Sequence, residues 1–158
     1  MNILFVCSGN VSRSFLAEML LRYEISKKDL EGISVSSAGL FASPGSPADP
    51  EMLSYLLREG IPVLNHRARQ IEEKDVAWAD RIYVMERRQG EIVEETWPDA
   101  KGKIKHLGAL ISAPPYMDDI VDPFGRSPYY YRLSQSQISL AVKRLVDCLL
   151  RRGINPSA

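Results

Sequence analysis

Residues 2–14 read NILFVCSGNVSRS, and this stretch decides the fold class of the chain. Its first five residues, Asn2 to Val6, form a short run with β-branched and aromatic members, which is typical of a buried strand. Polar residues and a glycine follow at positions 8–10. Beyond them, apolar side chains recur at the spacing of a helix: Leu16, Met19, Leu20 and Tyr23. The stretch therefore predicts a strand, a tight loop and a helix in direct succession.

The same alternation continues along the rest of the chain. Patterns typical of strands occupy residues 33–38, 81–85 and 103–107, and short helical patterns occupy residues 72–79 and 88–97. A further helix follows Asp49-Pro50 and ends at Gly60, and the last one carries an apolar face of Ile138, Ala141, Val142, Leu145 and Leu149. This order predicts an α/β fold with a mainly parallel sheet and helices on both faces. Such sheets bind ligands at the carboxyl edge of their strands, which is where the loop after the first strand lies.

The composition indicates one globular domain over residues 1–158. Hydrophobic residues make up 45% and charged residues 25% of the chain, as in ordinary soluble proteins. Twenty basic and 20 acidic side chains cancel to a formal net charge of zero, which argues against nucleic acid or an anionic membrane as the partner. The apolar runs are too short for a membrane span, and no signal peptide is recognisable at the start.

The chain has two cysteines, Cys7 and Cys148, and two histidines, His66 and His106. Two cysteines cannot form a disulfide framework, and two histidines are too few for most zinc sites. We therefore expect a protein of the reducing cytoplasm without a structural metal. Both histidines are interpreted as structural or surface residues rather than catalytic bases.

Cys7 and Arg13 enclose a loop of small or flexible residues that is suited to binding an anion. Gly9 and Asn10 can adopt the positive φ angles that turn successive backbone N–H groups inward. A helix that starts near Ser14 adds unpaired N–H groups and the positive end of its dipole. The planar guanidinium of Arg13 can bind two oxygens of one phosphate.

The same surroundings favour the thiolate form of Cys7, because cations and helix N-termini stabilise a negative charge on sulfur. A thiolate beneath a bound phosphate could attack phosphorus in line with the leaving group. A lone intracellular cysteine is more often a small apolar packing residue. The strand before the loop, the helix after it and the Ser-Gly-Asn between them favour the nucleophile.

These residues resemble the signature of the low-molecular-weight protein tyrosine phosphatases, which places a cysteine, Gly-Asn and Arg-Ser directly after the first strand. The matching positions are Cys7, Gly9, Asn10, Arg13 and Ser14. Further similarity lies at residues 37–39, 66–70, 84–86 and 122–124. The resemblance covers nearly the whole chain in the right order and implies a four-stranded parallel sheet. It also implies a phosphatase that acts on phosphotyrosine in proteins and on small aryl phosphates through a cysteinyl-phosphate, without cofactor or metal.

A proton donor for the leaving group is expected in the loop that carries Asp118, Asp119 and Asp122. Composition alone does not choose among the three. The family pattern selects Asp122, because Asp-Pro-aromatic matches and Asp118-Asp119 does not. Once it has lost its proton, the same carboxylate could activate water in the second half-reaction.

The remaining site residues follow from the loop and from the resemblance. The phosphate-binding positions are Ser8, Gly9, Asn10, Val11, Ser12 and Ser14. The resemblance implies that Asn10 and Ser14 hold the loop in shape, and Ser37 is a plausible partner behind them. Phe124, beside the acid, and Phe41, after the second strand, could provide apolar walls for an aromatic ring.

The chain departs from the family pattern at two positions of this region. Many relatives carry a second cysteine before the arginine, where this chain has Ser12, so we expect no intramolecular disulfide to rescue an oxidised Cys7. Phe15 stands where the family usually has proline, and we expect altered packing with retained activity. Three tyrosines at residues 129–131 are interpreted as the start of the final helix.

Three other functions compete with the tyrosine phosphatase. Protein arginine phosphatases of the same fold share the Asp-Pro-Phe-Gly form of the acid loop, but their phosphate loop has threonine where this chain has Val11. Arsenate reductases use a similar loop with additional cysteines, which this chain lacks. A non-catalytic phosphate-binding module would leave Cys7 and Asp122 unexplained. Phosphoproteins are the expected partners, and we expect a monomer or a weak homo-oligomer.

Overall fold

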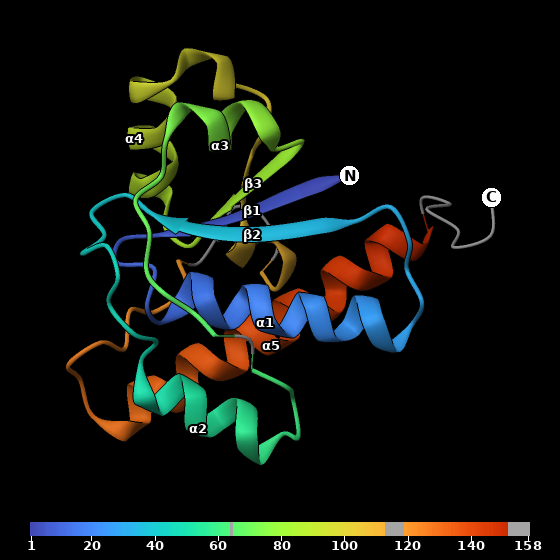
Figure 1. Cartoon of the computed structure of the whole chain (residues 1–158), viewed down its shortest axis with the longest axis vertical. Helices are drawn as coiled ribbons and strands as arrows, with labels where there is room; N and C mark the ends of the chain where they lie inside the picture. Colours follow the sequence, from blue (N-terminus) through green and yellow to red (C-terminus); the bar gives the residue numbers. More distant parts are fainter. Residues whose placement is uncertain (64, 113–118, 152–158) are drawn as a thin grey trace.

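β1 (Asn2–Cys7) is the strand formed by the apolar run at the start of the chain, and it lies inside a four-stranded sheet. The computed structural model describes residues 1–63, 65–112 and 119–151, and its strand order is β2-β1-β3-β4 with every neighbouring pair parallel (Figure 1). Residues 3–6 have no exposed surface, because β1 is paired on both edges and covered on both faces. A strand without a solvent-facing side is continuously apolar rather than alternating.

The other elements confirm the predicted alternation. They are α1 (Arg13–Lys27), β2 (Ser34–Gly39), α2 (Pro50–Arg58), α3 (Glu73–Trp78), β3 (Arg81–Val84), α4 (Arg87–Thr96), β4 (Ile104–His106) and α5 (Pro128–Arg151). Two 3-10 helices, η1 (Pro98–Ala100) and η2 (Leu107–Leu110), flank β4. The predicted strand at 103–107 is therefore shorter than expected, since Leu107 already belongs to η2.

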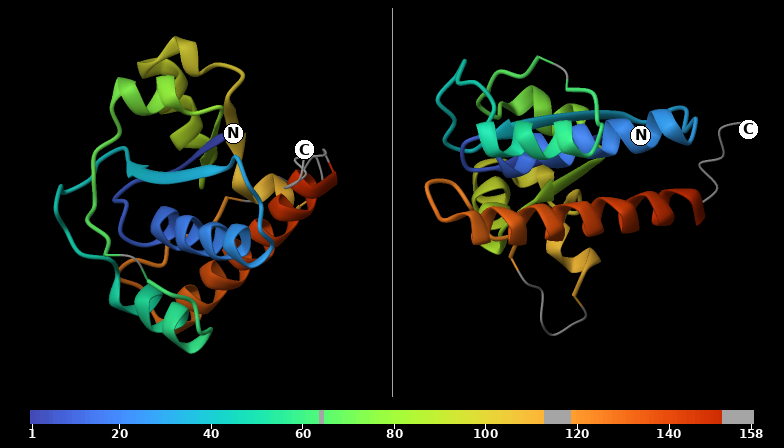
Figure 2. Two further views of the ribbon diagram at one scale, coloured as in Figure 1. Left: turned by 45° about the vertical axis from the view of Figure 1, so that its right-hand side comes forward. Right: turned by 90° about the horizontal axis from the view of Figure 1, so that it is seen from below.

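Helices cover both faces of the sheet, as predicted. Ile3 and Phe5 belong to a core that they share with buried residues of α1, α2 and α5. Leu4 and Val6 point to the other face and belong to a second core with α3 and α4. Figure 1 shows α1, α2 and α5 below the sheet and α3 and α4 above it, and the turned views of Figure 2 agree. Alternate side chains of one strand thus contribute to two separate cores.

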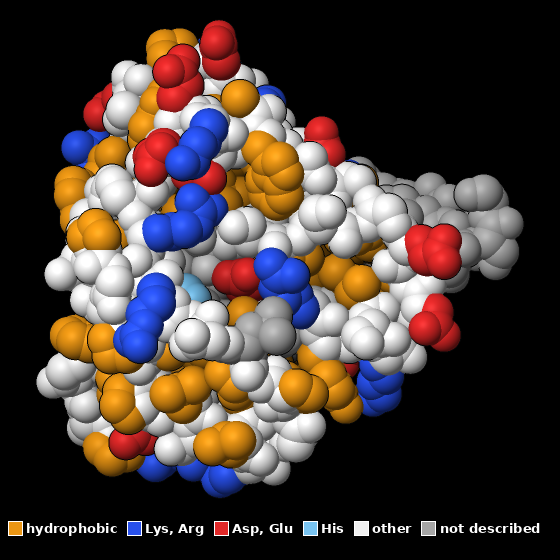
Figure 3. Space-filling view, in the orientation of Figure 1, with side chains coloured by type: hydrophobic (Ala, Val, Ile, Leu, Met, Phe, Trp, Pro, Cys, Tyr) orange, Lys and Arg blue, Asp and Glu red, His pale blue; other side chains and the backbone are white. Residues whose placement is uncertain are grey.

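α5 begins at Pro128, so residues 129–131 lie in its first turn, as the sequence predicted. Its buried residues fall on one side and pack below the sheet, mainly against α1. Among the described residues no helix combines the length and the apolarity that a bilayer crossing would need. On the face drawn in Figure 3, acidic and basic side chains are interspersed, in line with the zero net charge of the sequence.

Candidate active site

The loop between β1 and α1 curls around the sulfur of Cys7 at the carboxyl end of β1. The Cys7 Sγ lies 3.0 Å from the Ser14 Oγ and accepts a hydrogen bond from the backbone N–H of Asn10 at 3.3 Å. Cys7 is almost completely buried. α1 begins at Arg13, so the unpaired N–H groups of its first turn border the loop. The predicted strand, loop and helix are all present.

Asn10 is the residue that turns the loop. Its φ of 57° lies in the left-handed region, whereas Gly9 does not adopt a positive φ. The prediction that Gly9 supplies this conformation is therefore wrong, and Asn10 alone of the two supplies it. Asparagine tolerates the left-handed region better than most residues, because its short polar side chain can bond locally. Here the Asn10 Nδ2 donates to the Ser14 Oγ and to the Ser37 Oγ, both at 2.9 Å.

Ser37, in the second half of β2, extends this network away from the loop. Its hydroxyl donates to the carboxylate of Glu18, which also accepts from the Arg22 Nε at 2.9 Å. Ser37 therefore is the partner of Asn10 that the sequence suggested. Glu18 was not predicted, since an acidic residue in α1 has no signal that separates it from a solvent-facing one.

The end of β2 and the two residues after it also approach the loop through their backbone. The N–H groups of Leu40 and Phe41 donate to the carbonyls of Cys7 and Ser8, both at 2.9 Å. A Cβ atom added to Gly39 would lie 2.7 Å from the Ser8 carbonyl oxygen, a contact that side chains do not make. Glycine at this position therefore permits the close approach of β2 to the loop.

Arg13 is buried and held between two carboxylates. Its Nη1 contacts the Glu86 Oε1 at 2.5 Å and donates to the Ile120 carbonyl at 2.9 Å, and its Nη2 lies 3.3 Å from the Asp122 Oδ2. Glu86 lies two residues beyond the end of β3, at the carboxyl edge of the sheet. The guanidinium is therefore fixed in direction at the base of the site.

Gln89 connects Glu86 to the phosphate loop. Its side-chain oxygen accepts from the backbone N–H groups of Met85 and Glu86, and its Nε2 donates to the Ser8 Oγ at 3.3 Å. Gln89 and Glu86 form a capping box at the start of α4. The capping of α4 thus also positions the partner of Arg13.

Of the three acids in the predicted acid loop, Asp122 lies at the site. Its side chain is half exposed, and its Oδ1 accepts from the Phe124 N–H at 3.3 Å. Asp119 instead accepts from the backbone N–H of Arg87 at 2.8 Å. Asp118 lies outside the described residues. The position of Asp122 beside Arg13 is the one that the Asp-Pro-Phe pattern selected.

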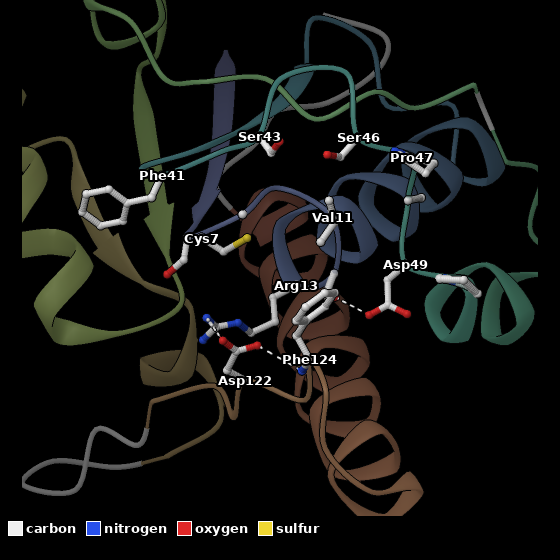
Figure 4. A pocket seen from close by; sticks show the side chains of 15 residues that line it. Cys7, Val11, Arg13, Phe41, Ser43, Ser46, Pro47, Asp49, Asp122 and Phe124 are labelled. Carbon is white, nitrogen blue, oxygen red and sulfur yellow. Dashed lines mark hydrogen bonds and ion pairs between the residues drawn. The ribbon is translucent and has the colours of Figure 1, made fainter.

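A cavity of about 550 Å³ opens over the loop. Cys7 and Arg13 lie at its base, Val11 contributes to its wall, and the exposed rings of Phe41 and Phe124 stand at its rim (Figure 4). Further lining residues come from the segment before α2 and from the first residue of that helix: Ser43, Ser46, Pro47, Ala48, Asp49 and Pro50. Within the described residues, no group of three or more His, Cys, Asp or Glu side chains could hold a metal ion.

Asp49 caps α2, as predicted, and it also contacts the loop. Its carboxylate accepts from the Ser12 Oγ at 2.5 Å and from the Tyr131 hydroxyl at 2.7 Å. Burial of the tyrosine, and then its contact with Asp49, raise the pKa of Tyr131 above the ordinary value. The Ser12 side chain is therefore directed toward the N-terminus of α2.

His66 contacts the back of the loop. Its Nε2 lies 2.6 Å from the Asn10 carbonyl oxygen, and its ring lies against the ring of the buried Phe15 at a centroid distance of 4.6 Å. These contacts agree with a structural interpretation of His66. Cys148 is partly buried in α5, away from the loop.

The family was identified by comparison with known proteins. Residues 2–153 match the family described as "Low molecular weight phosphotyrosine protein phosphatase". The chain belongs to this family. As a member, it is a cysteine-dependent low molecular weight phosphatase with the α/β fold described above.

The similar members of the family divide between two substrates. A protein-arginine-phosphatase of Geobacillus stearothermophilus is 35% identical over 147 residues, which cover 93% of this chain and 95% of that protein. A probable low molecular weight protein-tyrosine-phosphatase, EpsP of Ralstonia solanacearum, is 38% identical over 151 residues and covers 96% and 97%. A solved structure of a YwlE arginine phosphatase mutant with a phosphorylated active-site serine has a TM-score of 0.87 at 28% identity and covers 97% and 98%.

Proposed function

We propose that this chain hydrolyses phosphotyrosine in proteins, with Cys7 as the nucleophile, Arg13 as the phosphate-binding residue and Asp122 as the general acid and base. One observation carries the proposal: Cys7, Arg13 and Asp122 border the same cavity, and the Cys7 sulfur is contacted by the Asn10 N–H and the Ser14 hydroxyl. A nucleophile, a cation and a proton donor in one cavity are the groups that phosphoryl transfer without a metal requires.

In the first half-reaction, the Cys7 thiolate attacks phosphorus and the bond between phosphorus and the phenolic oxygen breaks. Asp122 donates its proton to that oxygen, so that a neutral tyrosine leaves. In the second half-reaction, the Asp122 carboxylate takes a proton from water while the water oxygen attacks phosphorus. The bond between phosphorus and sulfur breaks, the thiolate is restored and inorganic phosphate leaves. The phosphorylated active-site serine in the YwlE mutant supports such a covalent route.

The walls of the cavity support an aromatic leaving group. Phe41 and Phe124 present exposed rings, and the Val11 side chain has no hydroxyl to offer to a polar leaving group. A phenyl ring between these side chains would bury apolar surface on both of its faces.

The sharpest test of the mechanism is turnover of p-nitrophenyl phosphate by the wild type and by Cys7→Ser. We expect Cys7→Ser to lose turnover by several orders of magnitude, as is usual when a nucleophile is removed. It should still bind inorganic phosphate, since Arg13 and the loop amides remain. Turnover by Cys7→Ser at a rate close to that of the wild type would refute the proposal.

A protein arginine phosphatase is the second candidate, because arginine phosphatases are among the similar relatives. The two candidates are separated by comparing the kcat/KM values for one peptide that carries either phosphotyrosine or phosphoarginine. We expect the wild type to prefer phosphotyrosine and Val11→Thr to shift the ratio toward phosphoarginine. A wild-type preference for phosphoarginine would replace our assignment of the substrate and leave the roles of Cys7, Arg13 and Asp122 unchanged.

A further inference from the structure

A buried carboxylate ties the second half of the phosphate loop to two helices. Asp49 is 4% exposed, and its Oδ2 accepts from the Ser12 Oγ at 2.5 Å and from the Tyr131 hydroxyl at 2.7 Å. Its Oδ1 accepts from the Glu51 N–H at 3.0 Å. The backbone N–H of Asp49 donates to the Val11 carbonyl at 2.9 Å. The residue thus joins the loop, the start of α2 and the first turn of α5.

The donors to this carboxylate are all neutral. Throughout residues 1–63, 65–112 and 119–151, Asp49 has no ion-pair partner, so hydroxyl and amide groups alone compensate for its burial. A buried carboxylate that loses a hydrogen bond is strongly destabilised. Moving any of its donors away therefore costs free energy, which holds each donor in place. Because Ser12 belongs to the loop, its hydrogen bond to Asp49 fixes the backbone that follows Val11.

Tyr131 is suited to remain a donor. The tyrosine is nine-tenths buried, and burial followed by the contact with Asp49 raises the pKa of Tyr131. Its hydroxyl therefore keeps its proton over the whole neutral range. The neighbouring Tyr130 makes a different contact: the Arg126 Cζ lies 3.3 Å from the centroid of its ring. Of these two tyrosines, Tyr131 is the one that contacts Asp49.

We propose that Asp49 and Tyr131 are positioning residues for phosphate binding, which act through Ser12 on the geometry of the loop. Neither residue needs to touch the phosphate. The Asp49 carboxylate accepts from the Ser12 hydroxyl and the Asp49 backbone N–H donates to the Val11 carbonyl, so that the N–H groups of the loop converge on one point. The hydroxyl of Tyr131 holds that carboxylate. The Ser12 hydroxyl is the attachment point of the loop.

The test compares Tyr131→Phe with Tyr130→Phe, which removes the same hydroxyl from the adjacent residue without a contact to Asp49. The inhibition constant of inorganic phosphate is measured with p-nitrophenyl phosphate as substrate, well below the melting temperature of each variant. We expect Tyr131→Phe to weaken phosphate binding about five- to tenfold, which is less than the full effect of a lost hydrogen bond to a charged group because Tyr131 acts on the phosphate only through the loop. Tyr130→Phe should stay within about twofold of the wild type, as substitutions outside such contacts do.

A purely structural role would lower the melting temperature of Tyr131→Phe and leave the phosphate constant of the folded enzyme unchanged. That result would overturn the proposal. If Tyr131→Phe gives no folded protein, Ser12→Ala is measured in its place, because it removes the other donor to the same oxygen. It should weaken phosphate binding by a similar factor. An unchanged constant in Ser12→Ala would also refute it.

The double variant Tyr131→Phe/Ser12→Ala adds a further criterion. If both side chains act through Asp49, its loss of phosphate affinity should be clearly smaller than the product of the two single losses. Independent effects that multiply would contradict a shared route.

The proposal rests on phosphate binding by the loop but not on the identity of the substrate. A wild type that neither turns over nor binds phosphate would refute the proposed function itself, which is a different result from equal constants in the two tyrosine variants.

Discussion

Asn10 combines two properties at one position of the phosphate loop. Its backbone has a φ of 57°, and its buried side chain bonds to Ser14 and Ser37. It also accepts from the Arg69 N–H at 3.1 Å. The conformation and the side-chain contacts both favour asparagine, but they can be separated by substitution.

We predict that Asn10→Gly and Asn10→Ala both lose most of the phosphatase activity, because either substitution releases the Ser14 hydroxyl that contacts the sulfur. Asn10→Ala should be less stable than Asn10→Gly, since alanine in the left-handed region costs roughly 1–2 kcal/mol. Steady-state kinetics and urea unfolding measure the two effects. Full activity in Asn10→Gly would show that the backbone conformation alone is needed.

At the same scale, we predict that Asp122→Asn lowers kcat by about 10²–10⁴ for substrates with poor leaving groups. The loss should be smaller for p-nitrophenyl phosphate, whose leaving group needs less help from a proton. Asp119→Asn is the matched control, because Asp119 contacts the Arg87 backbone and not Arg13. Equal losses in the two variants would contradict the assignment of Asp122.

At the scale of elements, the first turn of α5 is connected to the start of α2 through Tyr131 and Asp49. The raised pKa of Tyr131 makes this connection sensitive to alkali. In the unfolded chain the tyrosine loses its proton near its ordinary pKa of about 10, whereas the folded chain keeps it. The contribution of this proton to stability is therefore complete below about pH 10 and decreases as the pH rises above that value.

We predict that Tyr131→Phe lowers the free energy of unfolding by about 1–3 kcal/mol at pH 8. The difference from the wild type should become smaller above about pH 10, where the wild type loses its advantage. Urea unfolding between pH 7 and 11 measures this, with Tyr130→Phe as the control for the remaining tyrosines. A difference that stays constant over the range would contradict the prediction.

At the scale of the whole molecule, the two cysteines lie in distant parts of the fold. Cys7 ends β1, whereas Cys148 lies in the last turn of α5, at the opposite end of the sheet from the phosphate loop (Figures 1 and 2). A disulfide requires Cα atoms within about 7 Å of each other and facing Cβ vectors. The fold therefore keeps the two thiols apart.

We predict that mild peroxide converts Cys7 to sulfenic or sulfinic acid without forming a Cys7–Cys148 disulfide. Peptide mass spectrometry after alkylation of the remaining thiols distinguishes these products. Cys148→Ser should give the same products and the same rate of inactivation as the wild type. A crosslinked Cys7–Cys148 peptide would contradict the predicted absence of rescue.

A feature of this protein could be predicted from the sequence where the interacting residues are neighbours along the chain. The strand, the loop and the start of α1 were predictable because residues 2–14 are contiguous and their pattern is local. The family resemblance supplied Asp122, which composition could not separate from Asp118 and Asp119. Gly9 was wrongly expected to turn the loop, because both Gly9 and Asn10 tolerate a positive φ and only the contacts of Asn10 select between them.

By itself, the sequence determined an α/β sheet with an anion-binding loop after its first strand, because apolar runs and small residues specify local backbone geometry. Only the tertiary structure decided what holds that loop. Glu86 is 73 residues from Arg13, and Tyr131 is 82 residues from Asp49, yet both pairs are in contact. The physical reason is that burial makes each charged or polar group find a partner, and the partner is chosen by how the sheet and the helices pack, not by spacing along the chain.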